Sequence, residues 1–253
     1  MILNHQYQQH LSSNLTPMVF IHGLFGSLSN LGMLARHFAE TRSVLQVDVR
    51  NHGGSGHSDI INYQVMAQDV IDTLIDLGIE QFVVIGHSMG GKIAMKLAEI
   101  AQEKIEKVIV LDIAPVQYYK QHHAEIFEAL FAVEKENPSS RIDAAKIMRK
   151  FIQEEMVIQF LLKSFNKGKW MFNVSALFDH YADIMQWESI QPFKKPTLFL
   201  RGELSFYISK PEHYAAIEEQ FLDHDIELIQ GAGHWLHGEK PKEVLEKIES
   251  FLN

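Results

Sequence analysis

The stretch "VVIGHSMGGKIAM", from Val83 to Met95, changes character in its middle. It begins as a run of β-branched apolar residues, which favours a buried strand, and it ends with the apolar spacing of a helix. Glycines and one serine, Ser88, separate the two parts. A side chain at Gly86 or Gly90 would collide with neighbouring backbone in a tight turn, so we expect a strained strand-to-helix turn that presents Ser88.

Short apolar runs recur along the rest of the chain, and helical patterns lie between them. The clearest helical pattern begins after Asn62, an expected N-cap, and stops at Gly78. Buried apolar strands that alternate with helices indicate a mostly parallel sheet covered by helices on both faces, which is an α/β fold. The expected strands are residues 18–21, 44–49, 82–85, 108–111, 197–200 and 226–229.

The alternation of strands and helices stops between about Pro115 and Pro192. Four helical patterns follow one another here, and no strand is expected between them. A helical block inserted between two strands of a sheet is best placed as a lid over one edge. We therefore expect residues 1–114 and 191–253 to form the core and residues 115–190 to form a helical cap.

The amino-acid composition argues against several classes of function. A net charge of −9 is unlike that of a protein that binds nucleic acid or an anionic membrane, because both need an excess of Lys and Arg on one face. Without cysteine, the chain has no disulfide, no thiolate nucleophile and no Cys-ligated metal. Residues 1–15 lack the pattern of a secretory signal, and no segment approaches the roughly 18 apolar residues of a membrane span, so we expect a cytoplasmic protein.

Residues 86–90 read Gly-His-Ser-Met-Gly, which fits the G-x-S-x-G pattern of a nucleophile elbow with a strand before it and a helix after it. A serine hydroxyl reacts when an imidazole accepts its proton, and the imidazole needs a carboxylate that fixes its tautomer. His234 follows the last expected strand, at the carboxyl edge of the sheet where Ser88 also lies. The sequence therefore predicts Ser88 as the nucleophile and His234 as its base.

Other histidines lie close to these motifs and are expected to be structural. His22 orders its loop, His52 braces a turn, and His87 packs beside the elbow. His234 and His237 have a spacing that occurs in metal sites, but nothing supplies further ligands at a recognisable spacing, so no metal is expected.

The chemistry of an activated serine also needs two backbone N–H groups where negative charge develops. One is expected from Met89, which directly follows the serine, and the other from the loop "HGLFG", residues 22–26, after the first buried strand. Leu24 is the preferred donor in that loop, and Phe25 is its neighbour. Each such donor typically supplies about 3 to 4 kcal/mol of transition-state stabilisation.

Five motifs occur in a characteristic order and spacing: "HGLFG", "VDVRNHGGSG", "GHSMGG", "LDIAPV" and "GAGHW". With them, the chain resembles the α/β-hydrolase superfamily over essentially its full length. The resemblance implies a hydrolase of small-molecule acyl esters or thioesters, with a helical cap and no cofactor. C–C bond hydrolysis or perhydrolysis on the same fold, and a receptor-like protein with little turnover, are alternatives.

The chain departs from the superfamily pattern at the triad acid. Members usually carry it as Gly-x-x-Asp in a loop after the strand that follows the cap, but in "LRGELSFYIS" Ser205 stands there. Asp112 is favoured in its place, because it ends a strand expected beside that of Ser88, and some superfamily members also have the acid there. Glu203 is the alternative, since its longer side chain would compensate for its earlier position.

Aromatic residues are expected to wall the substrate pocket. Trp235 follows the histidine, and Phe25 lies in the loop that supplies the second amide, so both are candidates. The expected cap holds seven of the sixteen Phe residues together with Trp170 and Trp187, which suits an apolar roof over the pocket.

Overall fold

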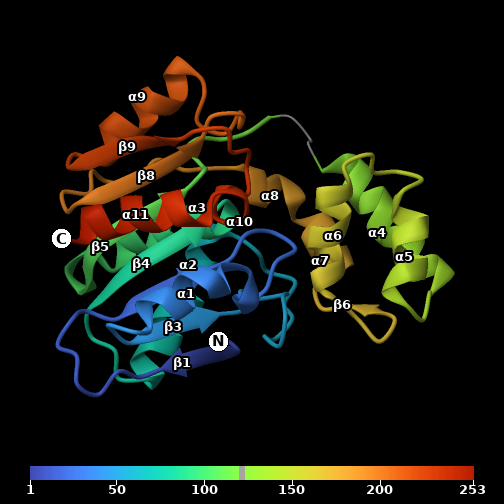
Figure 1. Cartoon of the computed structure of the whole chain (residues 1–253), viewed down its shortest axis with the longest axis horizontal. Helices are drawn as coiled ribbons and strands as arrows, with labels where there is room; N and C mark the ends of the chain where they lie inside the picture. Colours follow the sequence, from blue (N-terminus) through green and yellow to red (C-terminus); the bar gives the residue numbers. More distant parts are fainter. Residues whose placement is uncertain (120–122) are drawn as a thin grey trace.

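The structure is a computed structural model that describes residues 1–119 and 123–253 (Figure 1). Its central sheet consists of β1 (His5–Gln8), β2 (Met18–Ile21), β3 (Val44–Val47), β4 (Phe82–His87), β5 (Ile105–Leu111), β8 (Thr197–Gly202) and β9 (His224–Ile229). These strands lie in the order β1-β3-β2-β4-β5-β8-β9. Every neighbouring pair is parallel except β1 and β3. The predicted α/β fold with a mostly parallel sheet is confirmed.

In the central sheet, the strand that sequence reasoning missed is β1, at the edge. Its sequence, His-Gln-Tyr-Gln, contains no apolar run, and its residues alternate between half-buried and exposed. An edge strand pairs on one side alone, so it does not need the continuous apolar character of the central strands. Each of the six predicted apolar runs, in contrast, contributes to a strand.

Helices cover both faces of the sheet. They are α1 (Gly32–Phe38), α2 (Tyr63–Asp76), α3 (Met89–Ile100), α9 (Pro211–Gln220), α10 (Leu236–Glu239) and α11 (Pro241–Leu252), with short 3-10 helices at Leu28–Leu31 and Gln102–Lys104. Successive residues of a strand point to opposite faces. Met18 accordingly packs with α1 and α11, whereas Val19 packs with α2 and α3.

The ends of α2 follow the predicted signals. The Asn62 side chain accepts a hydrogen bond from the Val65 amide at 2.9 Å, which caps the first turn. Gly78 follows the helix with a φ of +68°, a conformation that glycine adopts without strain. Both boundary predictions are confirmed.

Between β5 and β8 the chain forms a mostly helical segment, which lies to the right of the sheet in Figure 1. We call residues 115–190 the insert. Its helices are α4 (Ala124–Glu136), α5 (Arg141–Met148), α6 (Glu155–Lys163), α7 (Val174–Asp179) and α8 (Tyr181–Met185). The expectation that it contains no strand is wrong, because β6 (Phe165–Asn166) and β7 (Lys169–Trp170) form a small antiparallel hairpin. Two residues per strand are too few for a periodic pattern, and Lys167 and Gly168 make the turn with positive φ angles.

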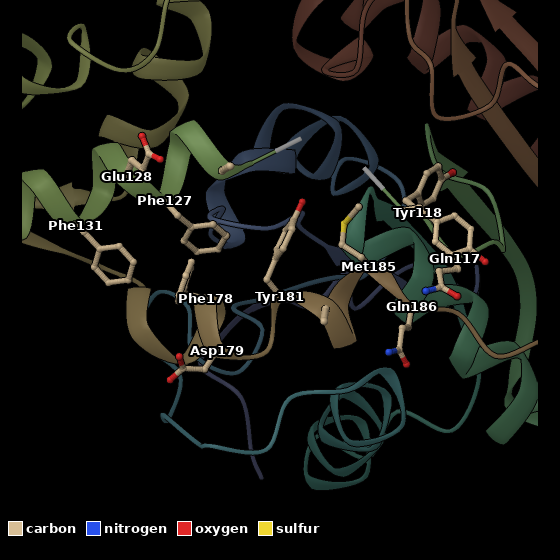
Figure 2. A pocket seen from close by; sticks show the side chains of 13 residues that line it. Gln117, Tyr118, Phe127, Glu128, Phe131, Phe178, Asp179, Tyr181, Met185 and Gln186 are labelled. Atoms are coloured by element: carbon tan, nitrogen blue, oxygen red, sulfur yellow. The ribbon is translucent and has the colours of Figure 1, made fainter. Parts of the chain in front are cut away.

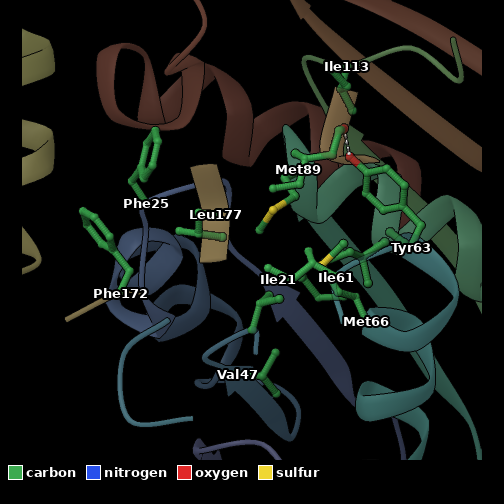
Figure 3. Packing of buried hydrophobic residues seen from close by; sticks show 14 of the residues in the cluster. Ile21, Phe25, Val47, Ile61, Tyr63, Met66, Met89, Ile113, Phe172 and Leu177 are labelled. Atoms are coloured by element: carbon green, nitrogen blue, oxygen red, sulfur yellow. Dashed lines mark hydrogen bonds between the residues drawn. The ribbon is translucent and has the colours of Figure 1, made fainter. Parts of the chain in front are cut away.

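The insert shares its apolar core with the sheet. Phe172 and Leu177 belong to the same cluster of buried residues as Ile21 of β2 and Met89 of α3 (Figure 3). Burial of apolar area of this kind is the main favourable term in folding. The insert is therefore packed on the core over a continuous apolar surface. In the described part of the chain, no helix combines the length and the apolar character needed to cross a bilayer.

Candidate active site

Ser88 forms the turn between β4 and α3. Its φ of 53° and ψ of −119° lie outside the regions that non-glycine residues usually adopt. Its amide donates to the carbonyl of Leu111 at 3.0 Å, so the pairing of β4 with β5 continues into the turn. Its own carbonyl accepts the amides of Gly91 and Lys92, which form the first turn of α3. The backbone thus fixes the half-buried Ser88 side chain at the carboxyl edge of the sheet.

The glycines around Ser88 are required by close backbone packing. A Cβ atom at Gly86 would lie 2.1 Å from the carbonyl oxygen of Gly90, and one at Gly90 would lie 2.2 Å from that of Ile21. Both distances are far below a van der Waals contact, so the predicted collisions are confirmed. Glycine at these positions lets α3 start directly against the ends of β2 and β4.

Asp112 lies beside Ser88 because their strands are neighbours. His87 pairs with Leu111 in the register of β4 and β5, and Ser88 and Asp112 are the next residues of the two strands. The Asp112 side chain is fully buried, and its Oδ2 atom accepts a hydrogen bond from Nδ1 of His234 at 2.7 Å. The structure therefore brings His234 and Asp112, which are 122 residues apart in sequence, into direct contact.

The Asp112 carboxylate has two further donors. Its Oδ1 atom accepts the Gly202 amide at 2.9 Å, and its Oδ2 atom also accepts the hydroxyl of Ser205. The serine that replaces the usual acid therefore contacts the carboxylate that lies next to His234. Glu203 is placed elsewhere, because its carboxylate accepts the Gly231 amide at 2.7 Å.

Two neighbours hold the backbone and ring of His234. Nε2 of His87 donates to the His234 carbonyl at 2.8 Å, and the ring of Tyr207 stacks on the His234 ring with centroids 4.1 Å apart. Burial, and then the nearby imidazoles of His237 and His234, lower the pKa of His87 well below its ordinary value, which keeps that ring neutral. Sequence reasoning placed His87 beside the elbow but missed Tyr207, because no pattern predicts how the loop after β8 folds back.

The loop of residues 22–26 lies over Ser88, and buried histidines shape it. Nε2 of His22 accepts the Val49 amide at 3.0 Å, and Nε2 of His52 accepts the Phe25 amide at 3.1 Å. Burial lowers the pKa of both histidines, that of His52 to about 3. Since the Phe25 amide is already used, the preferred donor for a developing oxyanion stays that of the half-buried Leu24.

The two residues predicted to wall a pocket have different surroundings. Phe25 is 2% exposed, and its ring packs against Phe127 of α4 with centroids 5.3 Å apart. Trp235 is half-buried, and its ring lies 5.5 Å from that of Phe160 on α6. Both residues therefore join the edge of the sheet to the insert, and of the two Trp235 has the more open position.

A cavity of about 530 Å³ lies in the insert among α4, α7 and α8, next to the first connection from the sheet (Figure 2). Its walls are mostly aromatic, and include Tyr118, Phe127, Phe131, Phe178 and Tyr181. Ser88 and His234 do not line it. The Tyr118 hydroxyl donates to the Tyr207 carbonyl at 2.6 Å, and Tyr207 stacks on His234, so these two tyrosines lie between the cavity and the imidazole.

Three imidazoles and a carboxylate lie close together, those of His87, His234, His237 and Asp112. Among residues 1–119 and 123–253, no group of three or more His, Asp or Glu residues has a geometry that would hold a metal ion. The chemistry available at the carboxyl edge of the sheet is that of a hydroxyl, an imidazole, a carboxylate and backbone amides.

The fold and this arrangement define a class of protein. Residues 16–241 match the family model of the α/β-hydrolase fold, and the chain belongs to that family. It is 47% identical to esterase YbfF of Escherichia coli strain K12, over 95% of this chain and 94% of that protein. It is 37% identical to the mouse sn-1-specific diacylglycerol lipase ABHD11, over 95% of this chain and 82% of that one. A solved structure of a marine microorganism esterase matches with a TM-score of 0.92 and 32% identity, over 99% of both chains.

Proposed function

We propose that the protein is a serine hydrolase that cleaves carboxylic esters, with Ser88 as nucleophile, His234 as base and Asp112 as the acid that orients the base. The observation that carries this proposal is the 2.7 Å contact between His234 and the buried Asp112 at the strand end next to Ser88. A strained serine, an imidazole and a carboxylate at one sheet edge form the constellation that activates a hydroxyl. Relatives named as an esterase and as a diacylglycerol lipase support an ester substrate.

In the first half of the proposed reaction, the Ser88 hydroxyl oxygen attacks the acyl carbonyl of the substrate while Nε2 of His234 takes the hydroxyl proton. Asp112 accepts the hydrogen bond from Nδ1, which fixes the tautomer and stabilises the imidazolium that forms. The amides of Met89 and Leu24 donate to the oxyanion of the tetrahedral intermediate. His234 then returns the proton to the leaving alcohol, and an acyl ester of Ser88 remains.

In the second half, a water molecule attacks the acyl-enzyme with His234 again as base. The proton then passes back to Ser88, and the free acid leaves. A thioester would react through the same steps with a thiol as the leaving group. The position of Ser88 at the N-terminus of the twelve-residue helix α3 assists both halves, because helix N-termini favour negative charge.

We assign the insert the role of a cap beside this site, with residues 1–114 and 191–253 as the catalytic core. Phe160 of α6 packs on Trp235, and the Ser164 hydroxyl donates to the Phe25 carbonyl at 3.0 Å. The insert thus contacts Trp235, which follows the proposed base His234. It also contacts the loop of residues 22–26, which carries the proposed second oxyanion donor, the Leu24 amide. Its aromatic side chains provide the apolar surroundings that an acyl chain would need.

The proposal is tested with a fluorophosphonate probe and a panel of substrates. We expect the probe to modify Ser88 in the native protein, as located by mass spectrometry of the labelled peptide. Nitrophenyl esters of graded chain length are expected to be hydrolysed, and acyl-CoA thioesters in the same panel report the preference for the leaving group. Ser88→Ala and heat-denatured protein are the controls, and neither should be labelled.

A native protein that is folded, remains unlabelled and turns over no ester or thioester would overturn the proposal. That outcome would favour a receptor-like protein. Labelling at a serine other than Ser88 would overturn the assignment of the nucleophile and leave the hydrolase class intact.

A further inference from the structure

Lys92 is a buried cation with no catalytic task in the proposed mechanism. It lies on α3, four residues after Ser88, and it is 1% exposed. Its Nζ atom donates to the backbone carbonyls of Gln186 at 2.9 Å and of Met185 at 3.3 Å. These carbonyls end α8, where a helix leaves oxygen atoms without an intrahelical donor. Lys92, on α3 of the core, therefore supplies hydrogen-bond donors to the carbonyl groups at the end of α8.

Three aromatic rings surround the same ammonium group. Nζ lies 5.1 Å from the ring centroid of Tyr118, 5.4 Å from that of Tyr63 and 5.9 Å from that of Trp187. Distances within about 6 Å give a favourable cation–π interaction, which strengthens when water is excluded. We call Lys92, Tyr63, Tyr118 and Trp187 the clasp.

The contacts of the clasp offset part of the free-energy cost of burying the Lys92 ammonium group. Burial lowers the pKa of Lys92 to about 7, whereas the two carbonyls and the rings favour its charged form. Burial raises the pKa of Tyr63 and Tyr118, so both rings stay neutral phenols.

The clasp joins the two connections between the core and the insert. Tyr118 lies in the connection that leaves β5 (Figure 2), Met185 is the last residue of α8, and Trp187 lies in the connection that returns to β8. The Tyr118 amide donates to the Met185 carbonyl at 3.0 Å. The Tyr63 hydroxyl, on α2, donates to the Ile184 carbonyl at 2.6 Å (Figure 3). Both connections are thus held against α2 and α3 at one point.

A short chain of contacts links the clasp to the proposed base. The Tyr118 hydroxyl accepts the Ala114 amide and donates to the Tyr207 carbonyl, and the Tyr207 ring stacks on His234. A shift of Tyr118 would therefore reach the imidazole through one intervening residue. It would also move the wall of the 530 Å³ cavity, which Tyr118 and Met185 line.

We propose that Lys92 is a positioning residue, which fixes the insert on the core and thereby sets how the site binds its substrate. This inference rests on the proposed function for its kinetic consequences. Its structural content, that one buried ammonium group holds both connections, does not depend on the reaction.

The test compares Lys92→Met with the wild-type protein at pH 6.5. Methionine keeps an unbranched side chain and removes the charge and the donors. We expect hydrogen exchange of the amides of residues 184–190 to become at least about tenfold faster, while the amides of β4 and β5 keep their wild-type rates. We expect KM for a long-chain nitrophenyl ester to rise about fivefold or more, with kcat for the same ester changed less than about twofold.

Two matched variants separate charge from packing. Lys104→Met removes an exposed lysine from the short 3-10 helix that follows α3, and it should change neither readout. Lys92→Arg restores a cation to the clasp and should recover at least part of the slow exchange, although its planar head group differs from an ammonium.

The outcomes are distinguishable. Wild-type exchange rates and KM in a folded Lys92→Met protein would overturn the inference, and so would a uniform fall in kcat without a change in KM. If Lys92→Met does not fold, Lys92→Gln, which keeps a donor without the charge, is judged by the same criteria. A wild-type protein without hydrolase activity would contradict the proposed function alone, because the exchange experiment still decides whether Lys92 holds the connections.

Discussion

The carboxylate that contacts His234 comes from the end of β5, and a serine stands where the family usually carries an acid. Asp112 reaches the imidazole because β5 is the direct neighbour of β4, so Asp112 needs no long loop to bring it there. The Ser205 hydroxyl donates a hydrogen bond to the Asp112 carboxylate. Two adjacent strand ends thereby hold the serine and the acid on rigid elements.

The relative importance of the two candidate acids is open to a direct test. We expect Asp112→Asn to lower kcat on a nitrophenyl ester by a factor on the order of 10³ to 10⁴, because an amide cannot hold the imidazole in the required tautomer. Glu203→Gln should change kcat by less than about twofold, since Glu203 contacts the Gly231 amide and not His234. Circular dichroism checks that both variants fold, and a larger loss in the glutamate variant would reverse the assignment.

At the scale of single residues, sequence reasoning was informative wherever a motif is local. The positions of Ser88, His234 and Asp112 follow from the ends of three strands, each of which is visible as an apolar run. The contacts of Ser205 and Tyr207 were not predictable, because they depend on the path of the loop after β8. The roles of the three motif residues in catalysis are predictions that the experiments above test.

The strand-turn-helix element around Ser88 shows how backbone proximity dictates sequence. The end of β2, the end of β4 and the start of α3 come within contact distance here. They can do so because Gly86 and Gly90 have no side chains. The same element carries the strained φ of the serine, so its stability depends on the packing of α3 against the sheet.

A pair of glycine substitutions tests this account. Gly90→Ala would place a Cβ atom 2.2 Å from the Ile21 carbonyl oxygen, and we expect it to lower the free energy of unfolding by about 3 kcal/mol or more. Gly238→Ala is the control, because no atom lies within 4 Å of its added Cβ and it sits in α10. Alanine there should be neutral or stabilising by up to about 1 kcal/mol in urea unfolding. Equal losses in the two variants would contradict the packing argument.

Most of the predicted strands differ from the missed strands in burial, and the exception is the predicted edge strand β9, which is only partly buried. Strands β2, β4, β5 and β8 are buried on both faces, so each appears in the sequence as an apolar run. The edge strand β1 and the two-residue strands β6 and β7 carry no such run. Their residues pair through the backbone, and the few buried side chains among them, such as Phe165 and Trp170, are too few to form a recognisable pattern.

Across the whole molecule, several buried histidines are held neutral. Burial lowers the pKa of His52 and of His237 to about 3, and it lowers that of His22 and His87 as well. In the unfolded chain these rings take up protons near pH 6.5. The folded state therefore binds fewer protons than the unfolded state between about pH 6.5 and pH 3, and its stability must fall as the pH falls through that window.

The ring of His237 offers the simplest test, because its buried Nδ1 atom has no hydrogen-bond partner among the described residues. With a folded pKa of about 3, it should account for roughly 2 kcal/mol of the stability lost between pH 7.5 and pH 5. We expect His237→Leu to show a correspondingly smaller loss when urea unfolding is measured at both pH values. His57→Leu, at an exposed position, is the control and should lose as much stability as the wild-type protein over the same pH range. A His237 variant with an unchanged pH dependence would mean that this ring is already protonated in the folded protein.

The overall architecture was the most predictable level. Alternating apolar and helical segments specify a layered sheet, and the long run of helical patterns correctly marked where that alternation stops. How the insert rests on the core was not predictable, because its contacts come from aromatic residues whose partners are far away in sequence. The pairing of Trp235 with Phe160 is one such contact.

Because Phe172 and Leu177 of the insert pack into the same apolar cluster as Ile21 and Met89, this segment is not a detachable module. If recombination replaced residues 115–190 by the corresponding segment of another family member, cavities would form between the insert and the sheet. They would be avoided only if the core side chains that contact the insert were replaced as well. A change of substrate range in this fold therefore requires coordinated substitutions in the insert and in the core residues that it contacts.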